Sequence, residues 1–203
     1  MRKKIIFTTV LLLFSLLGFN QNVENIDFVA PFSDGLAAIE KDGQWGFINE
    51  EGDIVIKMRS DLVLIKNNGK DYPVFSSGRC LIFKMKEGIK YFGYIDQNGE
   101  QILPPQYLNA THFQHDMAIV HVLIKTNVGN SQMLKKPLVS YDYFEAIIDP
   151  DGEVIKYLLE DPIHVTLSKE FLRKPPVITS KFISNHLIAQ WSKEKKWEII
   201  AIE

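Results

Sequence analysis

Cysteine is nearly absent from this sequence, which has a single one, Cys80, among its 203 residues. One thiol cannot form an internal disulfide, so a disulfide framework is excluded. Cys80 stands directly before the apolar run Leu81–Phe83, which predicts a small buried side chain. No cysteine follows the apolar N-terminal stretch, and this excludes a lipid anchor at a lipobox cysteine.

The common catalytic and nucleotide-binding motifs are missing as well. The sequence contains no Gly-x-Ser-x-Gly elbow, no phosphate-binding glycine loop and no dinucleotide fingerprint. Positive charge is not in excess either. Residues 1–20 hold three of the 23 Lys and Arg and none of the 25 Asp and Glu, so the rest carries a formal charge of −5. Such a balance argues against nucleic acid or an anionic membrane as the partner.

The first twenty residues are predicted to be a secretory signal peptide. Arg2, Lys3 and Lys4 precede the apolar stretch Ile5–Phe19, and a polar segment follows. This stretch is shorter than a typical membrane-spanning helix, although a retained N-terminal anchor is the alternative. We therefore expect a signal at 1–20, one domain at 21–203, and a periplasmic, outer-surface or secreted protein with no membrane span after signal removal.

Short apolar runs separated by glycine-containing turns fill the remaining chain. In the clearest unit, Phe32–Gly52, the run Leu36–Ile39 is followed by a turn ending in Asp42-Gly43 and by the run Trp45–Ile48. Short apolar runs around such turns are typical of antiparallel hairpins, and each run is too short to form a helix with a buried face. The unit is therefore predicted to be a three-stranded meander.

The pattern recurs three more times, at a period of about 50 residues, which indicates one structural unit repeated along the chain. The equivalent anchor residues are Trp45, Phe92, Glu145 and Trp197. We predict an all-β, open array of antiparallel hairpin units at about 28–66, 72–108, 110–167 and 177–203, the last degenerate. The third unit contains an insertion at about 126–142, predicted as a loop that extends a strand pair. One short helix is expected at 168–174, ended by two prolines.

The motif Phe-x-x-Gly-x-Ala, followed by Trp-Gly-Phe-Ile-Asn and a glycine turn, resembles the WG repeat, found in many bacterial proteins and often in exported ones. The resemblance is sharpest in Phe32–Gly52 and good in Phe75–Pro105. It is partial in the third copy, where Glu145 and Ala146 replace the Trp-Gly pair, and weak in the fourth. The family implies a β-hairpin repeat fold and no established catalytic residues.

Histidines and acidic residues provide one candidate catalytic set. His112 and His115 lie close in sequence, and Asp116 is adjacent. On a strand or turn this spacing does not bring two imidazoles together as a helix would, and no metal-binding signature accompanies it. The segment Asp149–Gly152 has some features of a calcium loop, but it lacks the remaining acidic ligands and matches the closing turn of the other units. We expect no catalytic residues, no cofactor and no metal.

Aromatic residues divide into two groups. Those at equivalent repeat positions are predicted to form a buried spine, because each hairpin must cover a face of its neighbour: Phe32, Trp45, Phe47, Phe75, Phe92, Tyr94, Phe113 and Trp197. Those outside that register are predicted surface contacts for a partner: Tyr72, Tyr107, Tyr141, Tyr143 and Trp191.

Two functions are compatible with these patterns. The first is an exported interaction or structural module that binds a protein or glycan at the cell envelope without catalysis, with the insertion as a place for specificity. Its edge strands also invite self-association. The second is an envelope hydrolase with a groove site around His112, His115 and Asp116.

Overall fold

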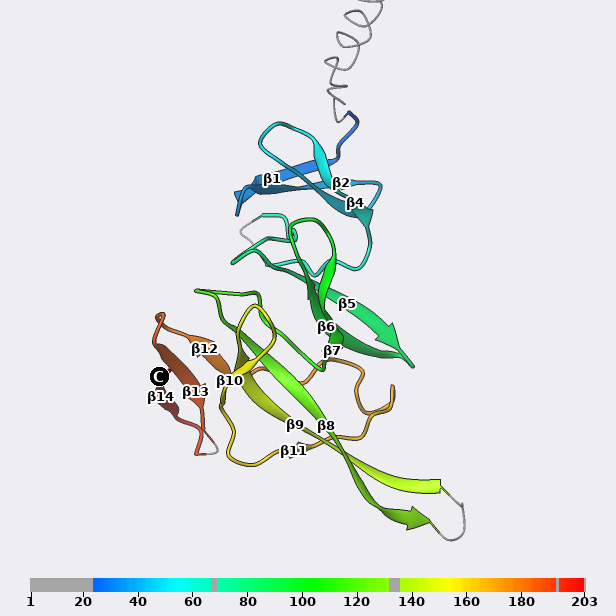
Figure 1. Cartoon of the computed structure of the whole chain (residues 1–203), viewed down its shortest axis with the longest axis vertical. Helices are drawn as coiled ribbons and strands as arrows, with labels where there is room; N and C mark the ends of the chain where they lie inside the picture. The colour runs from blue at the N-terminus through cyan, green and yellow to red at the C-terminus, as the bar shows by residue number, and fades with distance from the viewer. Residues whose placement is uncertain (1–23, 67–68, 132–135, 193, 203) are drawn as a thin grey trace, which may run out of the picture.

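The computed structural model describes residues 24–66, 69–131, 136–192 and 194–202 (Figure 1). The predicted signal peptide lies outside these residues. The described residues form four antiparallel sheets and contain no helix. Accordingly, none of them belongs to a helix with the length and apolar character needed to cross a membrane. The predicted all-β array of antiparallel hairpin units is confirmed.

The sheets follow one another in chain order, and we call them units 1 to 4. Unit 1 consists of β1 (Phe28–Ser33), β2 (Leu36–Lys41), β3 (Gln44–Ile48) and β4 (Ile54–Arg59). Unit 2 consists of β5 (Cys80–Lys86), β6 (Ile89–Ile95) and β7 (Gln101–Tyr107). Unit 3 consists of β8 (Ala118–Ser131), β9 (Lys136–Ile148), β10 (Val154–Tyr157) and β11 (Ile163–His164). Unit 4 consists of β12 (Ser180–Phe182), β13 (Leu187–Trp191) and β14 (Trp197–Ala201).

The turns that open the first three units have the same backbone conformation. Asp34 and Gly35 have φ angles of 50° and 76°, and the equivalent Ser77 and Gly78 have 53° and 69°. Two successive residues with positive φ form the turn that matches the twist of a tight hairpin. In unit 3 the same two places are taken by His115 and Asp116, at 53° and 59°. Two residues of the alternative hydrolase site, His115 and Asp116, therefore form the turn of a hairpin.

The closing turns of units 1 to 3 are capped by a side chain. The Oδ1 atoms of Asn49, Asp96 and Asp149 accept hydrogen bonds from backbone N–H groups four residues on, at 2.8, 2.8 and 2.9 Å. In each case a glycine N–H also donates to the carbonyl of the capping residue. The prediction that Asp149–Gly152 is a turn is confirmed.

The glycine that follows the anchor residue in units 1 and 2 is required because the neighbouring backbone leaves no room for a Cβ. Its φ angle is not positive. A Cβ on Gly93 would lie 2.4 Å from the carbonyl oxygen of Leu103 and 2.7 Å from the nitrogen of Pro105. A Cβ on Gly46 would lie 2.7 Å from the carbonyl oxygen of Ile56. The pairings with β4 and β7 shift register here, which brings the third strand close to the second.

Neighbouring units are joined by aromatic pairs that recur along the array. Phe47 of unit 1 contacts Phe75, which leads into unit 2, with ring centroids 4.7 Å apart. Tyr94 of unit 2 contacts Phe113 in the same way before unit 3, at 4.8 Å. Another cluster joins unit 3 to Ile188 of unit 4. Figure 1 shows unit 1 at one end and unit 4 beside unit 3, so the array is open.

The predicted aromatic spine is confirmed for six of its eight residues and wrong for two. Trp45, Phe47, Phe75, Phe92, Tyr94 and Phe113 are buried. Phe32 is 49% exposed and Trp197 is 51% exposed. Both belong to the terminal units of the described array, where the sheet face or edge on which they lie is not covered by a neighbouring unit.

Two local predictions also need correction. Residues 168–174 do not form a helix: the N–H of Leu172 donates to the carbonyl of Ser168 at 2.8 Å, which closes one turn before Pro175 and Pro176. One isolated turn gains too few hydrogen bonds to offset the entropy of ordering it. The insertion is mainly strand and not loop, because β8 and β9 pair out to Ser131 and Lys136, with Val128 as the extra residue of a bulge between Asn127 and Gly129. The predicted strand pair at its base is confirmed.

Cys80 is buried at the interface of units 1 and 2, as predicted. Burial raises the pKa of its thiol far above the ordinary range, so the thiolate is not accessible near neutral pH.

We expect a thiol reagent such as Ellman's reagent to leave Cys80 of the native chain unmodified over a time in which it fully modifies the chain in concentrated guanidinium chloride. The absorbance of the released thionitrobenzoate measures the modification of the native chain and of the denatured chain. Equal rates in the two conditions would contradict the burial of this residue.

Candidate functional site

The predicted set of His112, His115 and Asp116 is not assembled into one site. His115 and Asp116 are exposed turn residues beside an open cavity of about 560 Å³, which Met117 and His186 also line and His112 does not. Burial lowers the pKa of His112 to about 4, and its Nδ1 has no hydrogen-bond partner among the described residues. His112 is therefore a partly buried side chain that is neutral at neutral pH. In the described part of the chain no three His, Cys, Asp or Glu side chains are grouped to hold a metal.

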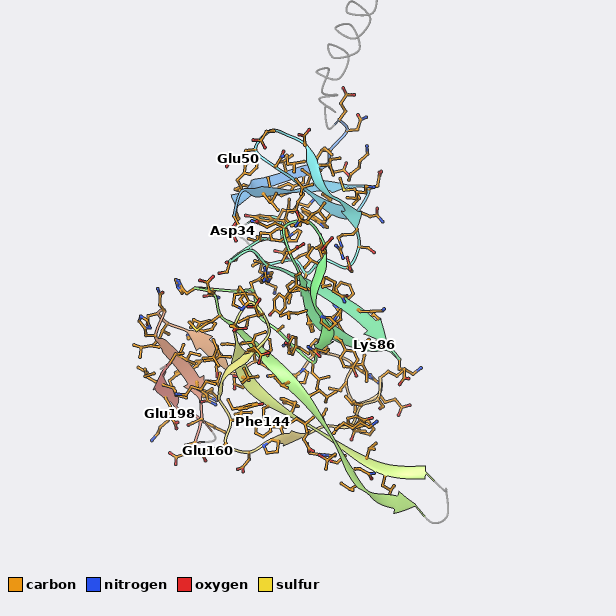
Figure 2. The ribbon with its side chains drawn as sticks, in the orientation of Figure 1. Asp34, Glu50, Lys86, Phe144, Glu160 and Glu198 are labelled. Atoms are coloured by element: carbon orange, nitrogen blue, oxygen red, sulfur yellow. The ribbon has the colours of Figure 1, made fainter. Side chains whose placement is uncertain are left out.

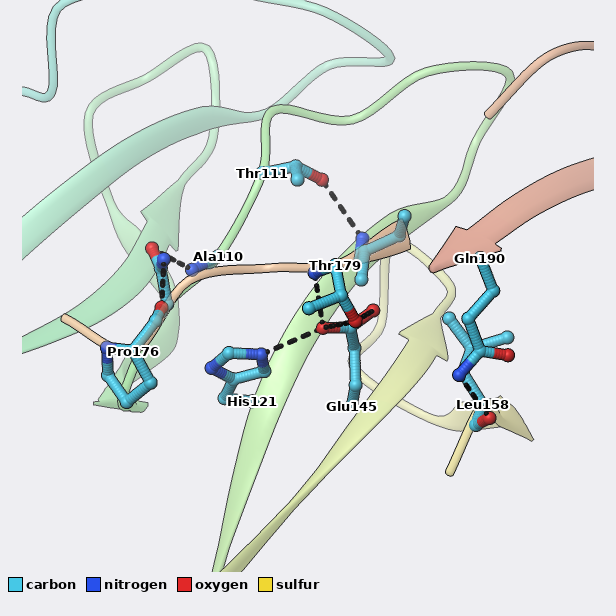
Figure 3. A network of polar contacts seen from close by, with 10 residues as sticks. Ala110, Thr111, His121, Glu145, Leu158, Pro176, Thr179 and Gln190 are labelled. Carbon is cyan, nitrogen blue, oxygen red and sulfur yellow. Dashed lines mark hydrogen bonds and ion pairs between the residues drawn. The ribbon is translucent and has the colours of Figure 1, made fainter. Parts of the chain in front are cut away.

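A buried pair of polar side chains, His121 and Glu145, occupies the anchor position of unit 3 instead. His121 and Glu145 are cross-strand neighbours on β8 and β9, each 1% exposed, with Nε2 and Oε2 at 3.0 Å (Figure 3). The ring of Tyr143 stacks against His121 at 4.6 Å between centroids. In unit 1 the corresponding positions are Glu40 opposite Trp45. A polar pair thus replaces the aromatic anchor.

The Glu145 carboxylate also holds the residue that leads into unit 4. The backbone N–H of Thr179 donates to Oε2 at 2.9 Å, and the Thr179 hydroxyl lies 3.3 Å from both oxygens (Figure 3). Burial by itself would raise the pKa of Glu145, but the hydrogen bonds from His121 and from Thr179 outweigh it and lower the pKa. The carboxylate is therefore ionised at neutral pH. Solvent does not reach the pair, and the hydrogen bonds from Thr179 to Glu145 tie unit 3 to the segment that enters unit 4.

The outer face of unit 4 is the largest departure from the repeat. Trp191 and Trp197 face each other across β13 and β14, with ring centroids 5.1 Å apart at 71°. They are 43% and 51% exposed, and Ile199 on the same face is 67% exposed. The residues at the Ile199 position in units 1 to 3, Phe47, Tyr94 and Ile147, are all fully buried. We call Trp191, Trp197 and Ile199 the tryptophan face.

An acidic groove runs beside the tryptophan face. It encloses about 470 Å³ between β14 and the residues that follow β10. Among the described residues that line it there is no Lys or Arg, and four are carboxylic acids: Glu160, Asp161, Glu194 and Glu198. Figure 2 shows Glu160 and Glu198 on this side of the molecule. Trp191 lines the groove as well, so the two surfaces are continuous.

The predicted surface contacts are mostly elsewhere. Tyr107 and Tyr143 are buried, so those two predictions are wrong; their rings fill the cores of units 2 and 3. Tyr72 and Tyr141 are half-buried. Trp191 is the one large exposed ring of the five, and Trp197, predicted as core, lies beside it. The symmetric placement of the two tryptophans on either side of the charged stretch 192–196 is the sequence signal that could have identified the pair.

Comparison with known proteins identifies the repeat and nothing more specific. The family described as WG containing repeat matches residues 25–45, 45–69 and 92–121. These stretches cover β1 to β4 and run from β6 into β8. Neither the curated proteins nor the solved structures contain a match to the chain.

Proposed function

Since this chain is a WG-repeat protein, we propose that it is an exported interaction module that binds a protein or glycan at the cell envelope through the tryptophan face of unit 4. This proposal rests on a comparison of which sheet faces of the array are buried and which are exposed. At three places in the array the equivalent face is buried by the next unit, whereas in unit 4 two indole rings and an isoleucine are left exposed. Contiguous exposed apolar side chains are typical of interaction surfaces.

The chemistry of the face supports binding. Tryptophan offers a large apolar surface at low entropic cost and is enriched among the residues that dominate interface affinity. Lys181 lies over the ring of Trp197, with Nζ 4.6 Å from the centroid, and helps to hold that ring in place. A pre-positioned aromatic pair loses little conformational freedom when a partner covers it. Indole rings of this kind can pack on a sugar ring as well as on a peptide.

Export and location form the second part of the proposal, and they are supported by residues 1–20. The basic start followed by a short apolar stretch fits a secretory signal. A formal charge of −5 after its removal argues against nucleic acid or an anionic membrane as the partner.

The test is capture from an envelope extract by the immobilised full chain, with Trp197→Ala and Phe171→Ala compared to the unaltered chain. Phe171 is 74% exposed and belongs to the turn at 168–172, so its variant controls for loss of an exposed aromatic ring away from unit 4. We expect Trp197→Ala to reduce capture of the specific partner by about tenfold or more and Phe171→Ala to leave it unchanged. Thermal melts establish that both variants fold.

Protease treatment of the extract before capture distinguishes a protein partner from a glycan. Equal capture by Trp197→Ala would contradict the assignment of the face. A failure to capture any component above the level of blank matrix would contradict the binding function itself.

A further inference from the structure

Among the described residues no strand pairs with the outer edge of β14, where the repeat elsewhere places another strand, and at the end of this edge Lys156 Nζ donates to the Ala201 carbonyl at 2.8 Å. In units 1, 2 and 3 the second strand of the hairpin, β3, β6 or β9, pairs on its far side with β4, β7 or β10. β14 occupies the same position in unit 4, and its only strand partner among the described residues is β13. An exposed strand edge is a template for pairing with another extended chain.

The backbone groups that point outward from this edge can be assigned. The N–H of Ser192 donates to Lys196, and the N–H of Ile202 donates to His186, at 2.9 Å each. Hydrogen-bonded pairs alternate along an antiparallel ladder, so Glu198 and Ile200 direct their backbone groups toward β13. Trp197 and Ile199 therefore direct theirs to the open edge.

The two sides of the edge differ in chemistry. Trp197 and Ile199 place their side chains on the tryptophan face, and Glu198 and Ile200 place theirs on the opposite side, in the acidic groove. Glu160 and Glu194 line the same groove. An added strand would therefore meet apolar side chains on one face and carboxylates on the other.

We propose that β14 binds an extended segment of a partner protein as an additional antiparallel strand, with Lys or Arg side chains in the acidic groove and apolar side chains on the tryptophan face. This inference rests on the proposed binding function and narrows its partner to a protein with alternating basic and apolar residues. Directly opposed residues in an antiparallel pair share a face. The apolar residues of the segment thus oppose Trp197 and Ile199 and form the backbone hydrogen bonds to β14.

Charge favours such a segment over a second copy of this chain at the edge. Two β14 strands paired about a two-fold axis, with Trp197 of one copy opposite Ile199 of the other, would place the two Glu198 side chains directly opposite each other. Like charges opposed across a strand pair are destabilising, whereas a basic segment neutralises them.

The inference is tested with fluorescein-labelled Lys-Val-Lys-Val-Lys-Val-Lys and the full chain, by fluorescence anisotropy. A peptide of the same composition with its lysines in one block controls for charge alone. Two further peptides carry N-methyl groups on all valine amides or on all lysine amides. We expect the alternating peptide to bind and the block peptide to bind at least tenfold more weakly. Of the two N-methylated peptides, we expect only the one methylated at its lysine amides to keep the affinity of the alternating peptide.

Protein variants locate the site. Glu198→Lys is expected to weaken binding of the alternating peptide by about tenfold. Glu170→Lys, an exposed charge reversal in the turn at 168–172, is the matched control and should leave the affinity unchanged. Melting temperatures close to that of the unaltered chain show that both variants are folded.

Equal affinity for the alternating and block peptides, or for the two N-methylated peptides, would overturn strand addition. A concentration-dependent dimer in sedimentation, together with no peptide binding, would overturn it in favour of a second copy. If Trp197-dependent capture from the extract persists while no peptide binds, this inference fails and the proposed function stands. If both are absent, both fail.

Discussion

Replacing Glu145 with alanine is expected to lower the free energy of unfolding by about 3 kcal/mol or more. The carboxylate is 1% exposed and is held by His121 and by the backbone and hydroxyl of Thr179. Its removal leaves the buried imidazole and the Thr179 N–H without their acceptor, and each unsatisfied buried group carries a desolvation penalty. It also releases the segment that enters unit 4.

Guanidinium chloride unfolding of the full chain measures this effect. Glu51→Ala, at an exposed position in the closing turn of unit 1, is the control and should change the unfolding free energy by less than about 0.5 kcal/mol. His121→Ala leaves the carboxylate without its imidazole partner, and a double-mutant cycle with Glu145→Ala should give a coupling energy of about 1 kcal/mol or more. An effect of Glu145→Ala no larger than that of Glu51→Ala would contradict the role of the pair.

The pH dependence follows from the direction of the Glu145 shift. Its folded-state pKa lies below the ordinary value for a glutamate, so the folded state binds this proton less readily than the unfolded state. Its contribution to stability is therefore fully present above the unfolded pKa and is lost as the pH falls through the folded pKa. The decline of stability in acid should accordingly be shallower in Glu145→Ala than in the unaltered chain.

Replacing Gly93 with alanine should cost about 3 kcal/mol, the second large effect. The added Cβ would lie 2.4 to 2.8 Å from three backbone atoms of β7, belonging to Leu103, Pro104 and Pro105. None of these is the flexible end of a side chain, so β7 itself must move away from β6. The neighbouring residues Phe92 and Tyr94 are in the core between units 2 and 3, which transmits the strain to the array.

Two substitutions at equivalent positions calibrate this prediction. In Gly46→Ala the nearest backbone oxygen is 2.7 Å away and the next contact is the flexible Met58 side chain, so we expect a smaller loss than at Gly93. Ala146→Gly in unit 3, where a Cβ is already accommodated, should cost about 1 kcal/mol through the added freedom of the unfolded chain. Thermal and guanidinium chloride unfolding measure all three. A loss at Gly93 equal to or below that at Gly46 would refute the steric explanation.

The strand order and the turns were predictable from the sequence because their causes are local. Gly35 and Gly78 adopt positive φ angles without steric cost, and short apolar runs between such turns pair with their immediate neighbours. The register of the degenerate fourth unit was predictable for the same reason: Trp197 pairs across the hairpin as Trp45 does. The sequence motif includes Gly46 and Gly93, but the motif alone did not predict that the third strand approaches closely enough to require glycine at these positions.

The sequence by itself thus determined the repeat, its turns and the pairing within each hairpin, all of which depend on residues near one another in the chain. Only the tertiary structure decided which repeat positions are covered. Trp45 and Trp197 are equivalent in sequence, yet one is buried and the other is exposed, because burial depends on whether another unit stacks on that face. Likewise, Glu145 became a buried structural acid only through Thr179, which approaches it from a distant part of the chain.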